Sequence, residues 1–253
     1  MNRIGSIAKG FMAAVVLSSP LMTTLAPSAV MAATKSASVV RYQAIPSFAA
    51  TPEGFVPAGW NIEKRAQGDM NGDDVTDMAL VLRKDDPAKR FQNIQKPAAG
   101  VIDTNPRMLV VILARQDGSG FTLLGENHTL FPAVTRTTKK DPFARVSVES
   151  NHVLQVEFQT SSNEDQATTI DFSFFLRPEG FSLVGYSRMD SEFNFLDTDE
   201  TILRIFYLSG ERQMVKRTTG GQPKPETTYL PKRPLSPFGS IGNALTFNPD
   251  ARS

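Results

Sequence analysis

The sequence predicts a mostly β protein built from antiparallel sheets, with few or no long helices. After residue 55, short apolar runs alternate with polar residues, and clusters of Gly, Asn, Asp and Pro separate these runs. No later segment shows the apolar periodicity of a helix of three turns. Consecutive hairpins of this kind can form a meander, a sandwich-like pair of sheets or part of a propeller, and the sequence leaves these three arrangements open.

Residues 1–32 have the pattern of a secretory signal peptide. Arg3 and Lys9 charge its start, Phe11–Leu17 is a short apolar run, and small residues precede a cleavage point after Ala32. The apolar run is too short to span a bilayer, and we expect no membrane span after cleavage. The protein is therefore expected to be exported, to the periplasm or the extracellular space. Residues 33–54 are predicted to be a flexible leader.

The charge balance and the cysteine count limit the function classes. The chain has 27 basic and 26 acidic residues and no cysteine. This near-balance argues against nucleic acid as a partner, and disulfides and thiolate chemistry are excluded. Stability must therefore come from the core or from a bound ion. We expect the partner to be a protein of unknown identity or another component of the cell envelope.

Residues 55–217 are predicted to form one β-rich domain. Met108–Ala114 is a continuous apolar run with β-branched residues, which predicts a central strand buried on both faces; a buried helix segment is the rival interpretation. Val146–Phe158 and Ile202–Lys216 each predict a hairpin, and Ile170–Leu176 alternates like a half-buried strand.

Two later features concern the layout of the chain. The segments GFTLLGEN, Gly120–Asn127, and GFSLVGYS, Gly180–Ser187, are alike. Two copies are too few to close a propeller, so we interpret them as two like hairpins in one sheet system. Residues 218–253 are rich in proline and glycine and predict a tail that is extended or pinned across the surface.

One loop concentrates acidic residues within GDMNGDDVTDMALVLR, Gly68–Arg83. Its oxygen donors are the side chains of Asp69, Asn71, Asp73 and Asp77 and the carbonyl of Val75 between the last two. Acids packed this closely repel one another, and a cation would turn that repulsion into binding. Calcium takes about six to eight oxygen ligands, which a tightly curled loop can supply from alternate positions. The sequence therefore predicts a calcium site with a structural role.

The form of this loop distinguishes it from an EF-hand. Leu80 stands where the bidentate Glu would be, and a strand rather than a helix follows. The form GDxNxDxxxD before an apolar strand resembles the calcium loops of FG-GAP and VCBS-type repeats. Asp74 stands where such loops often have Gly, because the turn is sharp. A cation-free turn held by Asx hydrogen bonds is the alternative interpretation.

A longer resemblance covers most of the chain after the signal peptide. The run Phe55–Arg83, followed by NPRMLVVIL, DPFARVSV, GFSLVGYS and FYLSGER, is similar to a family of exported bacterial proteins of unknown function. Its members pair one such acidic loop with a β-rich remainder. The resemblance implies Asp69, Asn71, Asp73 and Asp77 as the calcium ligands, and it implies no activity.

The sequence favours a binding or structural role at the cell envelope or in the periplasm. The alternative is an envelope hydrolase that uses carboxylates of the acidic loops, the second of which is Met189–Glu200. A glycosidase would need two carboxyl groups about 5–10 Å apart across a cleft. His128 and His152 lack partners at metal-ligand spacing, and no Ser lies in a GxSxG motif. Trp60 is predicted to be a framework residue rather than a sugar-stacking platform.

Overall fold

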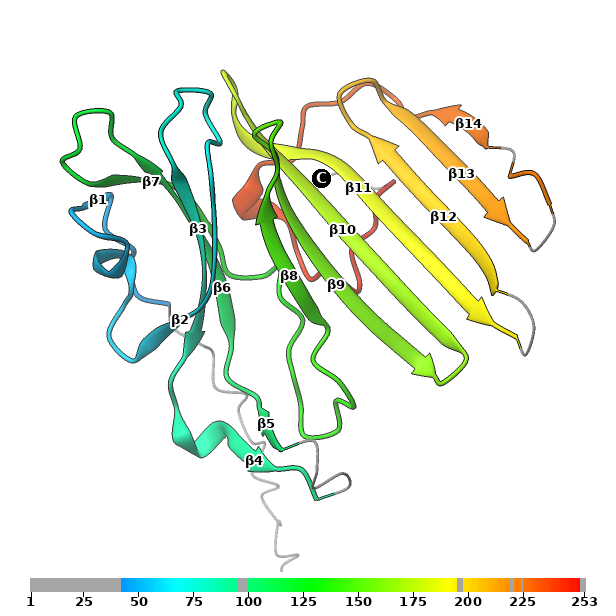
Figure 1. The fold of residues 1–253 in the computed structure, drawn as a ribbon, viewed down its shortest axis with the longest axis horizontal. Helices are drawn as coiled ribbons and strands as arrows, with labels where there is room; N and C mark the ends of the chain where they lie inside the picture. Colours follow the sequence, from blue (N-terminus) through cyan, green and yellow to red (C-terminus); the bar gives the residue numbers. More distant parts are fainter. Residues whose placement is uncertain (1–41, 95–99, 195–197, 219–220, 224, 251–253) are drawn as a thin grey trace, which may run out of the picture. The chain divides into compact units, whose positions relative to one another are not determined.

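The computed structural model describes residues 42–94, 100–194, 198–218, 221–223 and 225–250 (Figure 1). These residues belong to one unit and form antiparallel sheets, with no helix of seven or more residues among them. The prediction of a mostly β protein is therefore confirmed. The predicted signal peptide lies outside the described residues. In the described part of the chain, no helix is long and apolar enough to cross a membrane.

The first sheet has five strands in the order β1-β7-β6-β3-β2. Its strands are β1 (Phe48–Ala49), β2 (Trp60–Gly68), β3 (Asp77–Lys84), β6 (Arg107–Ala114) and β7 (Phe121–Asn127). A two-stranded sheet of β4 (Arg90–Gln92) and β5 (Val101–Asp103) is inserted between β3 and β6. Single turns of 3-10 helix occur at η1 (Pro52–Phe55), η2 (Pro87–Lys89) and η4 (Phe238–Ser240).

Strand β6 is the central strand that its apolar run predicts. It pairs with β3 on one side and β7 on the other. Leu109 and Val111 point into one hydrophobic cluster, whereas Val110 and Ile112 point into a second cluster on the opposite face. Successive side chains of a strand alternate between faces, so a strand buried on both faces reads as a continuous apolar run. The rival helix is therefore wrong.

The second sheet has seven strands in chain order, β8 to β14, which is a meander. Its strands are β8 (Phe143–Val148), β9 (Leu154–Asn163), β10 (Gln166–Arg177), β11 (Gly180–Phe193), β12 (Thr198–Phe206), β13 (Glu211–Arg217) and β14 (Glu226–Tyr229). Strands β8 and β9 form the first predicted hairpin, and β12 and β13 form the second. Short turns join these strands, so neighbours in sequence pair in space.

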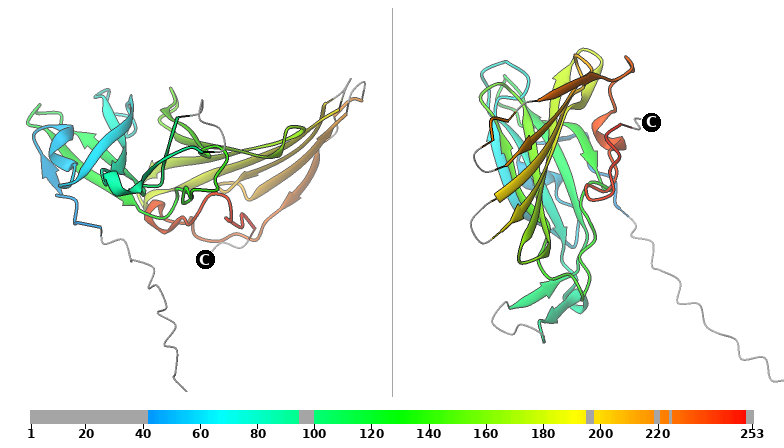
Figure 2. Two further views of the ribbon diagram at one scale, coloured as in Figure 1. Left: turned by 90° about the horizontal axis from the view of Figure 1, so that it is seen from below. Right: turned by 90° about the vertical axis from the view of Figure 1, so that its right-hand side faces the viewer.

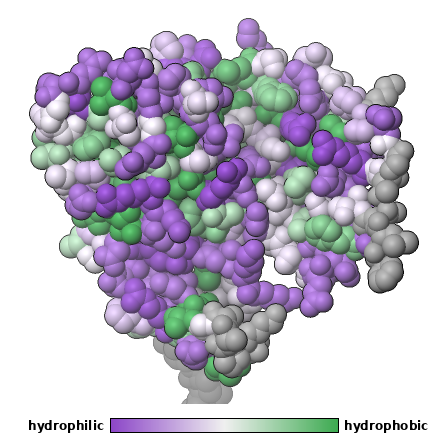
Figure 3. All heavy atoms as spheres, viewed as in Figure 1, coloured by the Kyte–Doolittle hydropathy of each residue, from purple (hydrophilic) through white to green (hydrophobic). Residues whose placement is uncertain are grey.

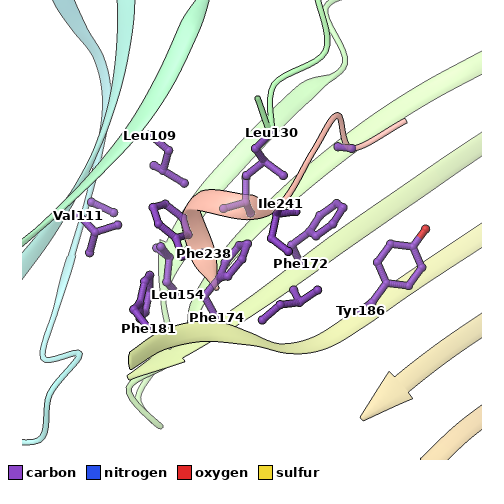
Figure 4. Packing of buried hydrophobic residues seen from close by; sticks show 14 of the residues in the cluster. Leu109, Val111, Leu130, Leu154, Phe172, Phe174, Phe181, Tyr186, Phe238 and Ile241 are labelled. Carbon is purple, nitrogen blue, oxygen red and sulfur yellow. The ribbon is translucent and has the colours of Figure 1, made fainter. Parts of the chain in front are cut away.

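The two large sheets share one hydrophobic core (Figure 4). Leu109 and Val111 come from the five-stranded sheet, and Phe172 and Phe174 come from β10. Phe238 of the C-terminal segment packs edge-to-face on Phe174, with ring centroids 5.1 Å apart. Aromatic side chains bury large areas, so this cluster provides much of the driving force for folding.

The C-terminal segment covers one face of the seven-stranded sheet (Figure 2). Phe238, Ile241 and Ala244, which lie in the predicted Pro/Gly-rich tail, are almost fully buried in the shared core. Of the predicted leader, residues 42–54 are described: Ile45 is buried, and β1 pairs with β7. Both segments cover apolar sheet faces that would otherwise be exposed to water.

The two alike segments lie in different sheets, as strands β7 and β11, rather than in one sheet system. Each strand contains a bulge at the same position. Leu124 of β7 and Val184 of β11 have no paired residue on the neighbouring strand, and a glycine follows each of them. A Cβ at Gly125 would lie 3.2 Å from the Phe238 ring, and one at Gly185 would lie 3.2 Å from Cβ of Ser173. The likeness therefore reflects a shared local bend in two strands.

Candidate functional site

The acidic loop joins β2 to β3 and folds around the carboxylate of Asp69. The backbone N–H groups of Asn71, Gly72 and Asp73 donate to Oδ1 of Asp69, and that of Asp74 donates to Oδ2, over 2.7–3.3 Å. Desolvation opposes ionisation of Asp69, but these four N–H donors outweigh it and hold the pKa of the carboxyl below its ordinary value. Asp69 is therefore the anion around which the loop curls.

Two further side chains complete the turn. Asn71 Oδ1 accepts the N–H of Asp73 at 3.1 Å, and Asp73 Oδ1 accepts the N–H of Val75 at 2.9 Å. Gly72 and Asp74 both adopt positive φ, 80° and 63°. Asp74 thus takes the left-handed conformation at the position where Gly is usual, which short polar residues tolerate better than most. These are the Asx hydrogen bonds of the cation-free alternative.

Asp77 differs from the other acidic residues because it is fully buried. Its Oδ2 accepts the N–H of Met70 and its Oδ1 accepts the N–H of Ala114 at the end of β6, both at 2.8 Å. Burial raises the pKa of Asp77, the two hydrogen bonds lower it, and the negative charges of Asp73 and Asp69 raise it again, so the net direction is upward. The carboxylate ties the loop to the middle of the five-stranded sheet.

Residues from other elements also reach the loop. His152, in the turn between β8 and β9, places Nδ1 2.8 Å from the carbonyl oxygen of Asp69 and 3.5 Å from its Oδ2. Gln116 donates to Oδ2 of Asp73 at 3.4 Å. Among the described residues, no Lys or Arg forms an ion pair with Asp69, Asp73 or Asp77. The negative charge of the loop is therefore poorly balanced by the protein itself.

The chemistry of these donors fits calcium. The predicted ligands of the loop are three carboxylates, an amide oxygen and the Val75 carbonyl, all of them hard oxygen ligands. Within the described ranges, no three Asp, Glu, His or Cys side chains are close enough to hold a metal ion as they stand. The carboxylate oxygens accept N–H groups instead: Oδ1 of Asp69 accepts three of them, and Oδ2 of Asp73 accepts two side-chain amides. A cation would have to replace some of these hydrogen bonds. Calcium would supply the positive charge that neighbouring residues do not.

A second candidate site is a hollow of about 760 Å³ on the seven-stranded sheet. Asp171 and Ser173 of β10 line it, whereas Phe172 and Phe174 of the same strand point into the core. The hollow therefore lies on the face that the C-terminal segment leaves free, which is the largely hydrophilic face in Figure 3. Sequence reasoning missed it, because the alternation of β10 marks a solvent face without showing which strands lie beside it.

Asp171 is the most perturbed acid of this hollow. Burial, and then the negative charge of Glu157 on β9, raise the pKa of Asp171 to about 6, while Arg145 works in the opposite direction. Glu157 itself accepts a hydrogen bond from Arg145 Nε at 2.6 Å. The two carboxyl groups thus have different environments, one paired with a guanidinium and one without a hydrogen bond from any described residue.

The other residues singled out in the sequence lie apart from both sites. Of the second acidic cluster, Asp190 bonds to Arg188 and Thr168, Glu200 pairs with Arg217, and Asp197 lies outside the described residues. His128 stacks on Tyr42 with ring centroids 4.0 Å apart. Trp60 is buried in the second hydrophobic cluster, so it is a core residue as predicted.

Comparison with known proteins adds no relative. No family model, curated protein or solved structure matches the chain. The function must therefore be inferred from the two sites themselves. The acidic loop is the site with a defined donor set, and the hollow is the one with space for a ligand.

Proposed function

We propose that the protein is an exported binding or structural module of the cell envelope or periplasm, in which calcium stabilises the junction between β2 and β3. The ligands would be Asp69, Asn71, Asp73, Asp77 and the carbonyl of Val75. The observation that carries the proposal is the buried carboxylate of Asp77. Its pKa is raised by burial and by the negative charges of Asp73 and Asp69, and no described Lys or Arg pairs with either of these two acids. A divalent cation would remove that repulsion.

The role of the ion is stabilisation by mass action, because a ligand bound only by the folded state raises its stability. The loop fixes the start of β3, and Asp77 also holds the end of β6. Calcium there would rigidify the central strands of the five-stranded sheet. The seven-stranded sheet, which carries the hollow, would be the binding surface of this module.

Thermal unfolding of residues 33–253 tests the proposal. In millimolar calcium the melting temperature should exceed that in excess EDTA by about 5–10 °C if the dissociation constant is about 10 µM. The double variant Asp69→Ala, Asp73→Ala should lose this difference. The control Glu164→Ala, Asp165→Ala, which removes two exposed acids from the turn between β9 and β10, should keep it. Coincident melting curves in calcium and EDTA would show that the loop is a cation-free turn.

A hydrolase is the second candidate, and the raised pKa of Asp171 favours it, since a carboxyl group protonated near pH 6 suits a general acid. Glycoside hydrolysis needs a second carboxyl group across the scissile bond. Glu157 is engaged by Arg145 and does not line the hollow. Glu211 does line it, and it accepts a hydrogen bond from Gln213. The binding role therefore has the stronger support from the contacts of these acids.

A further inference from the structure

A row of five residues crosses the free face of the seven-stranded sheet, and we call it the binding strip. Its members are cross-strand neighbours on consecutive strands from β10 to β14: Ser173, Gly185, Phe206, Glu211 and Tyr229. Cross-strand partners point to the same face of a sheet, so these residues share the face of the hollow. The first four of them line the hollow itself.

Gly185 shapes the strip because it carries no side chain. It leaves the backbone of β11 bare between Ser173 and Phe206, and a Cβ there would lie 3.2 Å from Cβ of Ser173. The bulge at Val184 bends the strand at the same point. At Gly185 the hollow is therefore lined by backbone, next to the half-exposed side chain of Phe206.

Two aromatic rings of the strip are exposed to solvent. Phe206 is 45% exposed and Tyr229 is 73% exposed. They stand two strands apart, so their Cα atoms are separated by about 10 Å. This separation is comparable to the length of two pyranose units in an extended chain. Exposed rings at such a spacing can stack on the apolar faces of alternate sugars.

Polar side chains beside the rings have no hydrogen-bond partner among the described residues. Gln155, Asp171, Ser173, Ser187 and Arg204 all line the hollow, and no side-chain hydrogen bond within the described chain engages any of them. They offer both donors and acceptors. A ligand rich in hydroxyl groups, each of which donates and accepts, would satisfy this mixed set.

The charges of the lining balance. Arg145 and Arg204 contribute two positive charges, and Asp171 and Glu211 contribute two carboxyl groups. A strongly anionic or cationic ligand would meet a group of its own sign as often as one of the opposite sign. The lining therefore favours a neutral ligand with one apolar face and many hydroxyl groups.

We propose that the binding strip holds a neutral, extended oligosaccharide, which lies across strands β10 to β14. Its rings stack on Phe206 and Tyr229, and its hydroxyl groups bond to the polar side chains of the hollow. This inference deepens the proposed binding role and rests on it. It does not depend on a cation in the acidic loop, which belongs to the other sheet.

Isothermal titration calorimetry with neutral hexasaccharides tests the inference. The probes are cellohexaose, maltohexaose and N-acetylchitohexaose, with hexagalacturonate as the anionic comparison. We expect at least one neutral probe to bind, and Phe206→Ala and Tyr229→Ala each to weaken it about tenfold. Phe193→Ala should leave binding unchanged, because Phe193 is also 45% exposed on the same sheet but lies outside the strip. Both rings of the strip are exposed, so these variants should fold.

Three results would overturn the inference: no neutral hexasaccharide binds at millimolar concentration, binding survives both aromatic substitutions, or hexagalacturonate binds more tightly than every neutral probe. The calcium experiment fails separately. If the melting temperature rises with calcium but no saccharide binds, the calcium proposal stands and the binding strip is wrong. If a saccharide binds but calcium has no effect on the melting temperature, the binding strip stands and the calcium proposal is wrong.

Discussion

At the scale of single residues, Asp77 links the acidic loop to the sheet through two buried hydrogen bonds. An amide in its place can accept from only one of the N–H groups of Met70 and Ala114, and its NH₂ group would face the other. We expect Asp77→Asn to lower the free energy of unfolding by about 1–3 kcal/mol, as measured by urea denaturation in EDTA.

The control for this variant is Asp74→Asn in the same loop. It makes the same change of charge, but the side chain of Asp74 accepts no hydrogen bond from a described residue, and Asn tolerates its positive φ. Its effect should lie within about 0.5 kcal/mol of zero. Equal changes in the two variants would show that the two buried hydrogen bonds of Asp77 add nothing to stability.

Asp171 gives a prediction about pH. Its pKa is about 6 in the folded protein, against 3.8 for the ordinary group, so the folded state holds this proton more tightly than the unfolded chain. The ionised carboxylate therefore costs stability, with no cost below about pH 4 and the full cost above about pH 6. We expect Asp171→Asn to gain about 1–2 kcal/mol over the native protein between these pH values, after allowance for solvent screening.

Urea denaturation of both proteins at intervals from pH 4 to 8 measures this difference. A constant difference across the range would mean that Asp171 titrates near its ordinary value. Agreement with the pH prediction would show that burial and the charge of Glu157 destabilise the ionised carboxylate of Asp171.

At the scale of elements, one buried side chain makes two of the hydrogen bonds that hold the C-terminal segment. Asn127 at the end of β7 donates to the carbonyls of Phe238 and Ile241 at 2.6 and 3.0 Å, and its Oδ1 accepts the N–H groups of Thr129 and Leu130. The amide is buried, so without it the N–H groups of Thr129 and Leu130 would lose their acceptor. The two carbonyls would each keep one other donor, Ile241 N–H for Phe238 and Thr129 Oγ1 for Ile241.

We expect Asn127→Ala to lower the free energy of unfolding by about 2–4 kcal/mol, because two buried N–H groups lose their acceptor and two carbonyls lose one of their donors. Asn151, an exposed residue of the turn between β8 and β9, provides the control as Asn151→Ala. Chemical denaturation gives both values. If the two variants are equally stable, the segment is held by apolar packing alone.

At the scale of the whole molecule, one ion network connects the five-stranded sheet to the start of β8. Arg107 on β6 is 4% exposed and pairs with Glu63 on β2 and with Asp141 just before β8. Arg83 on β3 pairs with the same two acids at 3.0 and 3.3 Å. These contacts join strands that lie far apart in sequence, so they form only when the chain is folded.

Removal of one partner from a buried network leaves uncompensated charge. Arg107→Ala should therefore lower the free energy of unfolding by about 3–5 kcal/mol. Arg107→Lys should recover only part of the loss, because an ammonium cannot bond to two carboxylates as the planar guanidinium does. Arg145→Ala, which breaks the exposed pair with Glu157, should cost about 0–1 kcal/mol. The network is unimportant if denaturation gives the same loss for Arg107→Ala and Arg145→Ala.

The fold class was predictable because strand periodicity and turn residues are local properties. The run around Val110 indicates a central strand, and the alternation after Ile170 indicates a half-buried one, without reference to any other part of the chain. The acidic loop was recognisable for the same reason, since its donors lie within one turn. The calcium that they suggest stays a prediction.

The tertiary structure decided which residues distant in sequence come into contact. It placed the N–H of Ala114 against Asp77, inserted Phe238 beside Gly125, and brought Ser173, Phe206 and Tyr229 into one row. Each of these contacts depends on which strands become neighbours and in which register, and a shift of one residue would turn every side chain to the other face. By itself, the sequence determined the elements and the loop chemistry. The pairing of strands, which is set by burial of the shared core, decided where a ligand could bind.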